Sequence, residues 1–201
     1  ARRHLARAWR DFDGAHFEQL AADGLEALEL KARVQHLAKA LEATLPLDFT
    51  AAAEVIEASL ATMQPPEGDE APKPAGDGLA GWVVWSLGEF VVRRGLGEPA
   101  RALATLHALT QRSTAEFAVR PFIEAHPELA FDTLHAWARD PSPHVRRLAS
   151  EGSRPRLPWG AQLKGLITDP SPTLPLLATL QDDPSPYVRR SVANHLNDIA
   201  K

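Results

Sequence analysis

The residues best suited to chemistry gather in one stretch, Val145 to Gly160, which reads VRRLASEGSRPRLPWG. It begins as a short amphipathic helix, breaks at Gly152 and continues as a loop that ends in Trp159. It carries four arginines, Arg146, Arg147, Arg154 and Arg156. Guanidinium groups match phosphate geometry well, and an indole ring can stack on a base. The stretch therefore predicts contact with a polyanion and a flat group, with a buried Trp159 at the start of the next helix as the alternative.

Two carboxylates, Glu116 and Asp198, have positions that fit either a structural or a functional role. Glu116 completes the pattern Ser113-x-x-Glu116, which is typical of a capping box at a helix start. Asp198 falls on the last turn of an expected helix, where the helix dipole is already negative and an acid is unfavourable. A solvated surface residue or a cap for a following helix is the ordinary alternative for Asp198. Both carboxylates remain candidates for a site.

The sequence lacks the motifs of disulfide, metal and nucleotide sites, and it lacks the segments of a secreted or membrane-spanning protein. The chain has no cysteine, so disulfides and thiolate metal sites are excluded. Its histidines show none of the usual metal-binding spacings, and no phosphate-binding glycine loop or nucleophile elbow is present. We therefore expect no metal and no cofactor. The basic N-terminus lacks the apolar segment of a secretory signal, and no apolar run is long enough for a membrane span, so a cytoplasmic location is expected.

Charge is distributed unequally along the 201 residues. The formal net charge is −4, but residues 1–80 carry −6 and residues 81–201 carry +2. The positive half is rich in arginine, which suits a phosphate-binding surface. Ordinary solvated helix faces are the alternative. A single domain is expected, with acidic N-terminal helices over residues 1–63, a mobile loop over 64–78 and a basic repeat region over 79–201.

Apolar residues recur at helical spacing through most of the chain, and no stretch has the alternation of a half-buried strand. An all-α class follows. Trp82 and Trp85 are expected in the core, and Thr50 is expected to cap a helix. On the last helix the expected core face contains Val188, Val192, Leu196 and Ile199. Helices are expected over residues 25–45, 50–63, 82–92, 99–111, 115–125, 129–138, 143–152, 158–168, 172–180 and 186–199, after a short mixed helix within 1–22.

An internal repeat refines this class. DPSPHVRR at Asp140–Arg147 returns as DPSPYVRR at Asp183–Arg190, 43 residues later, and a related DPSP begins at Asp169. In each copy serine can cap a helix that has proline in its first turn. A period of 40–47 residues built from helix pairs is typical of HEAT-like repeats. The expected architecture is a right-handed α-solenoid of such repeats, which presents a concave binding surface.

Four segments resemble the AlkC branch of the bacterial DNA alkylation repair glycosylases: LELKARVQHLAKALEATLPLDF, EFAVRPFI, VRRLASEGSRPRLPW and YVRRSVANHLNDIAK. The resemblance covers about residues 28–201. It implies a cofactor-free, monofunctional, monomeric glycosylase that removes small cationic methylated bases, chiefly 3-methyladenine, from duplex DNA without flipping the base. Family members continue past the last motif, so this chain is expected to lack C-terminal repeats. A shorter DNA-binding surface is expected to lower DNA affinity and activity.

The resemblance also implies roles for particular residues. Asp198, Glu116 and Trp159 match the family's active-site carboxylates and aromatic residue. Asp198 would stabilise the positive charge of the sugar, Glu116 would complement the lesion or sugar, and Trp159 would contact the exposed nucleotide. The expected phosphate contacts are Arg146, Arg147, Arg154, Arg156, Arg189 and Arg190. The alternative function is a non-catalytic HEAT-repeat module that binds DNA or protein, for which the carboxylates need not meet in one cleft.

Overall fold

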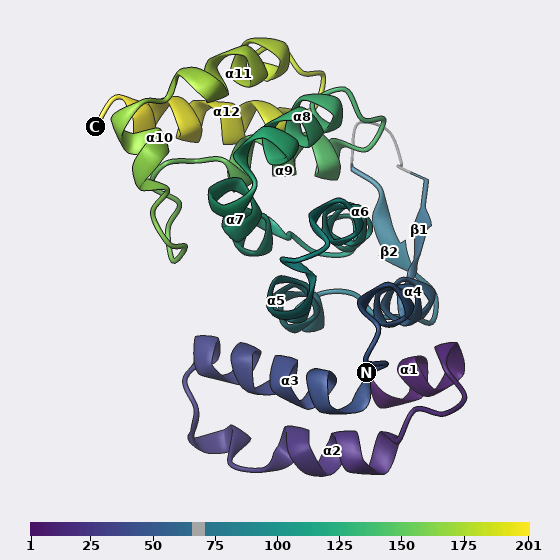
Figure 1. Ribbon diagram of the computed structural model, residues 1–201. Helices are drawn as coiled ribbons and strands as arrows, with labels where there is room; N and C mark the ends of the chain where they lie inside the picture. Colours follow the sequence, from purple (N-terminus) through teal and green to yellow (C-terminus); the bar gives the residue numbers. More distant parts are fainter. Residues whose placement is uncertain (66–70) are drawn as a thin grey trace.

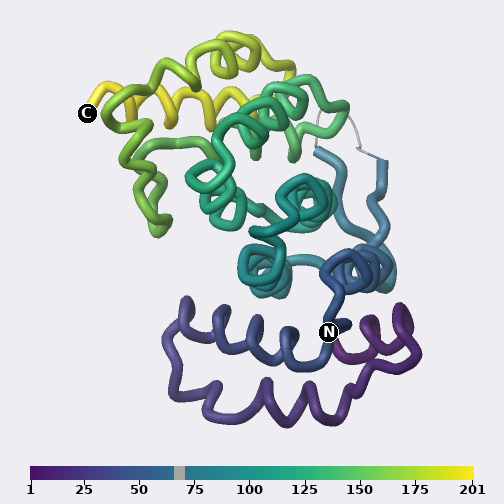
Figure 2. The backbone as a smooth tube through the Cα atoms, viewed as in Figure 1, coloured from purple at the N-terminus to yellow at the C-terminus, as the bar shows by residue number. Residues whose placement is uncertain are grey.

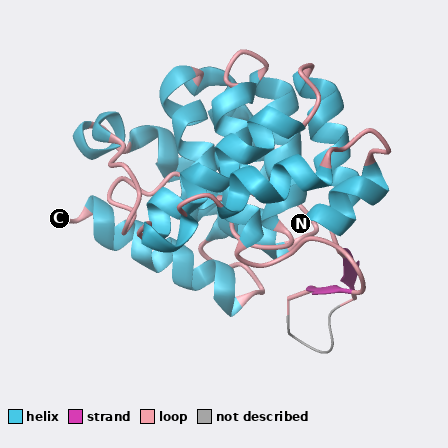
Figure 3. Cartoon of the chain, turned by 90° about the horizontal axis from the view of Figure 1, so that it is seen from below, coloured by secondary structure: helices cyan, strands magenta, loops and turns pink. Residues whose placement is uncertain are grey.

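The structure, a computed structural model, describes residues 1–65 and 71–201 and is mostly helical, as predicted (Figures 1 and 3). The α-helices are α1 Arg2–Ala8, α2 Gly14–Ala22, α3 Leu30–Thr44, α4 Phe49–Ser59, α5 Val83–Gly95, α6 Pro99–Thr110, α7 Glu116–Ala125, α8 Pro127–Trp137, α9 Pro143–Gly152, α10 Lys164–Thr168, α11 Leu174–Leu180 and α12 Pro186–Ile199. Two short 3-10 helices, η1 Leu25–Ala27 and η2 Ser171–Thr173, precede α3 and α11.

The helices stack in layers that follow chain order. Figures 1 and 2 show α1, α2 and α3 at one end, α4 to α6 next, then α7 to α9, and α10 to α12 at the other end. Helix α3 packs on α5, α5 on α7, and α9 on α12. One apolar cluster runs through the layers, from Leu5 in α1 to Val192 in α12. The stack therefore brings the loop after α9 close to helices from earlier layers.

The segment expected to be a mobile loop begins and ends with regular structure. Strands β1 Thr62–Gln64 and β2 Lys73–Ala75 pair antiparallel, with Met63 opposite Pro74. This corrects the expectation that no strand would form, while residues 66–70 of the expected mobile loop lie outside the described residues. Ala61 and Leu79 are also joined, because the Ala61 amide donates to the Leu79 carbonyl at 3.0 Å. A Cβ at Gly78 would lie 2.3 Å from the Ala61 nitrogen, so only glycine fits there.

The repeated DPSP motif forms the same turn in each copy. Asp140 Oδ1 accepts the Ser142 amide at 2.7 Å, and Asp183 Oδ1 accepts the Ser185 amide at 2.8 Å. The prediction of a serine cap is wrong, because neither serine side chain caps its helix and the aspartates bind the turn instead. Proline does occupy the first turn of α9 and α12, as predicted.

The second carboxylate oxygens of Asp140 and Asp183 bind the preceding helical layer. Asp140 Oδ2 lies 2.8 Å from His107 Nε2 of α6, and Asp183 Oδ2 lies 2.6 Å from Arg146 Nε of α9. Burial opposes the charge on Asp183, but the hydrogen bonds from Arg146 and the Ser185 amide, with the charges of Arg146 and Arg189, together lower the pKa of that carboxyl. The DPSP turns at Asp140 and Asp183 are therefore also junctions between two layers.

Helix α12 buries Val188 and Val192 as expected, but the rest of its buried face differs from the prediction. Leu196 is 48% exposed, whereas Ser191, His195 and Asp198 are buried. The expected core face is thus wrong at Leu196, because polar partners on α9 and in the following loop make burial of the polar side chains favourable. Two further corrections concern helix starts: Asp48 rather than Thr50 caps α4, and α10 begins at Lys164 rather than near Pro158. None of the described helices is both long and apolar enough to cross a membrane.

Candidate active site

A surface pocket of about 430 Å³ lies where the starts of α5 and α7 face the end of α9 and the loop that follows it. We call it the tryptophan pocket. It is lined by Gly81, Trp82, Trp85, Ser113, Thr114, Glu116, Phe117, Glu151, Arg154, Leu157, Pro158 and Trp159. Glu116 and Trp159, which the sequence placed far apart along the chain, thus meet in one pocket together with Arg154.

Glu116 is the first residue of α7. Its Oε2 accepts the Thr114 hydroxyl at 2.7 Å and lies 2.6 Å from Arg147 Nη1. The capping box with Ser113 is not formed, because α7 has no side-chain cap at its start. The Glu116 carboxylate is therefore turned toward the pocket and Arg147 rather than back onto the helix backbone.

Asp198 is buried, with only 2% of its surface exposed, so the solvated alternative is wrong. It accepts two hydrogen bonds from the Arg154 guanidinium, Nε to Oδ2 at 2.9 Å and Nη2 to Oδ1 at 3.2 Å. Arg156 donates to the Asp198 backbone carbonyl. Asp198 does not line the tryptophan pocket itself, because the Arg154 side chain lies at the pocket wall and Asp198 lies behind it.

Glu151 joins these two carboxylates and was not predicted from the sequence. It is 5% exposed, and its Oε1 lies 2.7 Å from Arg154 Nη1 and 3.5 Å from Arg147 Nη2. Ser191 of α12 donates to its Oε2 at 2.6 Å. The spacing of Arg147, Glu151 and Arg154 could have predicted this role of Glu151, since residues four and three apart share one helix face.

The charged side chains form one alternating series, Glu116, Arg147, Glu151, Arg154 and Asp198, which we call the charge chain. With every group ionised, three carboxylates face two guanidiniums, and the Lys201 ammonium lies 4.0 Å from Asp198 Oδ1 at the far end of the series. Burial alone would lower the pKa of Arg154, but its hydrogen bonds to Asp198 and Glu151 raise that pKa above its ordinary value. Of the charge chain, Glu116, Glu151 and Arg154 line the tryptophan pocket, so its wall presents two carboxylates and one guanidinium.

Aromatic side chains form the other part of the wall. Trp159 is 67% exposed and Trp82 is 74% exposed, so the core interpretation is wrong for both. Trp85 stacks on Phe117 with ring centroids 4.9 Å apart, and the Trp82 and Trp85 centroids are 6.4 Å apart. Trp159 has φ of 65°, which is rare for a residue with a side chain. The indole is therefore presented to solvent by a backbone conformation that costs free energy.

The six predicted phosphate contacts divide into two groups. Arg146, Arg147 and Arg154 are engaged by carboxylates within the protein. The other three, Arg156, Arg189 and Arg190, have no side-chain carboxylate partner among the described residues. Arg189 donates to the backbone carbonyls of Asp183 and Pro184 at 2.6 and 3.0 Å. Arg189 and Arg190 are both exposed on α12, so their remaining donors face solvent.

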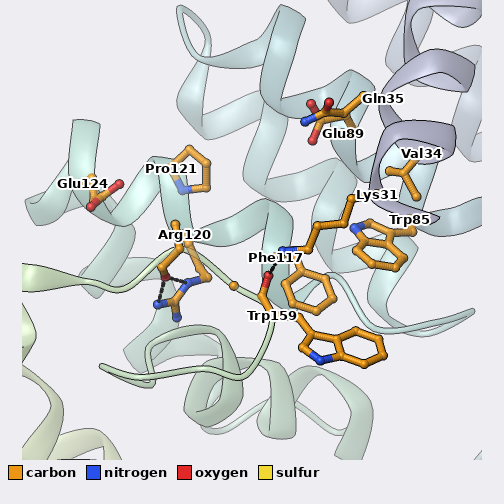
Figure 4. A pocket seen from close by; sticks show the side chains of 12 residues that line it. Lys31, Val34, Gln35, Trp85, Glu89, Phe117, Arg120, Pro121, Glu124 and Trp159 are labelled. Atoms are coloured by element: carbon orange, nitrogen blue, oxygen red, sulfur yellow. Dashed lines mark hydrogen bonds between the residues drawn. The ribbon is translucent and has the colours of Figure 1, made fainter. Parts of the chain in front are cut away.

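A smaller pocket of about 260 Å³ shares Trp85, Phe117 and Trp159 with the tryptophan pocket (Figure 4). Lys31 and Gln35 of α3, Glu89 of α5 and Arg120 of α7 also line it. Figure 4 shows Lys31 extending from α3 to the Trp159 carbonyl, with Arg120 bonded to the chain just beyond that residue. The Trp159 segment therefore lies between two pockets.

Known proteins resemble this chain along almost its whole length. No family model matches the sequence. A solved structure, Pseudomonas fluorescens alkylpurine DNA glycosylase AlkC bound to DNA containing an abasic site analog, matches 99% of this chain with 34% identity and a TM-score of 0.84. The chain is AlkC-like. The resemblance predicted from the sequence motifs is thereby confirmed.

A second relative extends the similarity. The uncharacterized protein YhaZ of Bacillus subtilis (strain 168) is 40% identical over 199 residues, which is 98% of this chain. The AlkC-like chain spans about half the length of each relative, 51% of YhaZ and 51% of the AlkC chain. The AlkC-like fold thus includes every element that lines the tryptophan pocket.

Proposed function

We propose that this protein is a DNA glycosylase that excises small cationic alkylated bases, chiefly 3-methyladenine, from duplex DNA. The observation that carries the proposal is that two carboxylates of the charge chain, Glu116 and Glu151, line a pocket that also has two exposed tryptophans. The similarity to an alkylpurine DNA glycosylase supports it. The substrate class follows from the chemistry of the proposed reaction.

A base methylated at N3 carries a positive charge and departs as a neutral molecule, so the reaction needs little acid catalysis. The barrier is the oxocarbenium-like sugar that forms as the glycosidic bond breaks. Fixed negative charge in a water-poor site stabilises such a transition state strongly. Glu116 and Glu151 reach the tryptophan pocket directly, and Asp198 contributes its charge from behind Arg154. We propose Asp198 and Glu116 as the principal carboxylates, with Glu151 completing the set.

The lesion would be read at the protein surface, without base flipping. Trp159 and Trp82 are exposed beside the pocket, and aromatic rings bind nucleotides by stacking whatever their sequence. Phosphate contacts would position the duplex. Arg156, Arg189 and Arg190 suit that role better than Arg146, Arg147 and Arg154, because the latter three already bind carboxylates. Arg147 and Arg154 would instead hold the charge chain in place.

The test is release of 3-methyladenine from methylated duplex DNA under single-turnover conditions. We expect Asp198→Asn and Glu116→Gln each to slow release by about 10²-fold or more, as for loss of a transition-state charge partner. Asp182→Asn is the matched control, because Asp182 is exposed, adjacent to the same helix and outside the charge chain. Release at the wild-type rate by Asp198→Asn would remove that residue from the mechanism, and no release by the wild type would remove the enzyme assignment.

The alternative function is a non-catalytic HEAT-repeat module that binds DNA or protein. One observation favours it: every carboxylate of the charge chain is paired with an arginine, as in a purely structural network. Such a module would bind methylated and unmethylated duplexes equally and release no base. Binding and release measured on the same DNA separate the two functions.

The architecture proposed for either function is a right-handed solenoid of HEAT-like repeats within one domain. The layered order of the helices and the continuous apolar core support it. We further propose a monomer that acts in the cytoplasm, without metal or cofactor. Gel filtration with light scattering, alone and with duplex DNA, tests the monomer directly.

A further inference from the structure

The loop from Ser153 to Leu163 carries Arg154, Arg156 and Trp159, yet it contains no helix or strand. Its position must therefore be fixed by contacts from other elements. Arg154 and Arg156 of the loop bind Asp198 of α12, and two cations from earlier layers also bind the loop, Arg120 from α7 and Lys31 from α3 (Figure 4). We call this segment the tryptophan loop.

Arg120 is buried, with 1% of its surface exposed, and it has no carboxylate partner among the described residues. Its guanidinium donates only to backbone carbonyls. Nη1 binds Gly152 at 2.9 Å and Arg154 at 2.8 Å, while Nε binds Ala161 at 2.9 Å and Nη2 binds the same carbonyl. Three carbonyls at both ends of the tryptophan loop are thus fixed to one side chain.

Burying the Arg120 cation costs free energy, which indicates that its role is to fix the position of the tryptophan loop. Desolvation lowers the pKa of Arg120 to about 10, although the charge of Glu124 opposes the change. A buried cation without a counter-ion is expensive, and a loop that needed only stability could use apolar packing instead. Arg120 follows Glu116 by one turn of α7, so it fixes the loop relative to the helix that carries this carboxylate.

Lys31 acts at the tip of the same loop. Its ammonium group donates to the Trp159 carbonyl, across 128 residues of sequence. Trp159 holds φ of 65° at this point, and such a conformation persists only where surrounding contacts impose it. A Cβ at Gly160 would lie 3.2 Å from Leu157 Cδ2 and 3.4 Å from Arg120 Nε, so the chain is also closely packed just beyond Trp159.

We propose that Lys31 and Arg120 are positioning residues that hold the Trp159 indole beside Glu116 at the tryptophan pocket. This inference rests on the glycosylase function proposed above. Neither residue contacts the reacting atoms; Arg120 fixes the two ends of the tryptophan loop and Lys31 fixes its tip. Their loss should slow base release through Trp159 while leaving the fold intact where the residue is exposed.

The first experiment uses Lys31→Met, because Lys31 is exposed and its replacement should not prevent folding. We expect the single-turnover rate at saturating DNA to fall about 3- to 10-fold, which is within the range for misplacing a contact group. Lys39→Met, on the same helix and also exposed, is the matched control and should keep the wild-type rate. Equal rates for Lys31→Met and the wild type would overturn the role of Lys31.

A double-mutant cycle with Trp159→Ala separates positioning from a general structural role. If Lys31 acts through Trp159, adding Lys31→Met to Trp159→Ala should cause no further loss of rate. Full additivity of the two losses would overturn the proposal. Arg120→Lys, which keeps the charge but cannot span three carbonyls, should lower the rate about 10- to 100-fold per folded molecule. A wild-type rate for Arg120→Lys would overturn the role of Arg120.

A second readout does not depend on catalysis. The acrylamide quenching of Trp159, taken as the difference between each protein and its Trp159→Phe counterpart, reports how tightly the loop is held. We expect stronger quenching of Trp159 in Lys31→Met than in Lys39→Met. If the wild type released no base, the proposed glycosylase function would fail, whereas unchanged quenching in Lys31→Met would sink the positioning role alone.

Discussion

The Arg154 guanidinium holds the Asp198 carboxylate through two hydrogen bonds, from Nε to Oδ2 and from Nη2 to Oδ1. A third donor of the same guanidinium, Nη1, binds Glu151. Both partners of the bidentate pair are almost fully buried. Arg154 thus links a helix at one end of the stack to the wall of the tryptophan pocket, so the integrity of α12 and the charge of the pocket depend on one side chain.

Replacing Asp198 by Asn should destabilise the protein as well as slow the reaction. Breaking a buried ion pair by neutralising one partner typically costs about 3–5 kcal/mol, because the other charge stays buried. Urea unfolding measures the change in free energy. Asp182→Asn, which alters an exposed carboxylate next to α12, should leave the unfolding free energy within about 0.5 kcal/mol of the wild type. Equal stability of the two variants would show that the Arg154 pair contributes nothing.

Trp159→Ala should weaken DNA binding but leave the stability of the fold almost unchanged. Because the indole is 67% exposed, its removal should change the unfolding free energy by no more than about 0.5 kcal/mol. Loss of one stacking ring should weaken binding to DNA with an abasic site by about 1–3 kcal/mol. Fluorescence anisotropy of labelled duplexes checks this, with Leu47→Ala as the control because Leu47 is also exposed but lies outside both pockets. Unchanged affinity in Trp159→Ala would exclude stacking by this ring.

Acid should destabilise the fold through His195. Burial lowers the pKa of His195 from its ordinary value of 6.5 to about 4, although the Ser150 carbonyl and Asp198 oppose the change. Between pH 6.5 and 4 the unfolded chain therefore binds a proton that the folded chain does not. Stability from this source is complete above pH 6.5, decreases as the pH falls, and becomes constant below about pH 4. The loss is up to roughly 3 kcal/mol.

Unfolding of the wild type and His195→Gln at several pH values isolates this effect. Other carboxyls titrate in both proteins, so the difference between the two curves reports His195 alone. We expect the wild type to lose more stability than the variant on going from pH 7 to pH 4.5. Parallel curves would mean that His195 titrates normally in the folded protein.

Gly152→Ala should disturb the end of α9 directly beneath the site. A Cβ there would lie 2.4 Å from Val119 Cγ1 of α7, and overpacking of this kind costs about 1–3 kcal/mol. Gly165→Ala provides the comparison, since a Cβ at Gly165 meets no atom within 4 Å. Gly165 lies in α10, where alanine is favoured over glycine by roughly 0.5–1 kcal/mol. Thermal unfolding should therefore shift in opposite directions for the two variants.

Arg190→Ala should weaken binding to all duplexes alike and lower the salt dependence. Arg190 is exposed on α12 and has no hydrogen-bond or ion-pair partner among the described residues, so its guanidinium is available to phosphate. Losing one phosphate contact should reduce the slope of log affinity against log salt by about one unit. Arg10→Ala, on the N-terminal layer, should leave the slope unchanged. A slope equal to that of the wild type in Arg190→Ala would remove this contact.

Local signals were sufficient to predict some helices in full. Helices α9 and α12 have the predicted bounds, 143–152 and 186–199, because proline in the first turn and regular apolar spacing define both elements. The apolar part of the face that α12 buries, Val188 and Val192, followed from this spacing, but the polar part was not predictable from the helix alone. Burial of His195 and Asp198 depends on partners at Ser150 and Arg154, which come from α9 and the tryptophan loop.

The site was predictable in part for a similar reason. Glu116 and Trp159 followed from motifs, and they do line one pocket. Glu151 was missed because a glutamate within a basic helix looks like a surface residue until its two arginine partners are known. The helix expected from Pro158 was wrong because Trp159 adopts a left-handed conformation, in a loop that Lys31 and Arg120 bind from distant elements.

The DPSP junctions bear on how the number of repeats can change in such proteins. Asp183 accepts Arg146 from the previous copy of the motif, and Arg189 occupies in its own copy the position that Arg146 occupies in the first. One copy thus encodes both halves of a joint, an acceptor at its beginning and a donor six residues later. A tandem duplication in register would supply its own complementary contacts on both sides. Copies of the repeat could therefore be gained or lost in evolution without the need for a new interface between layers.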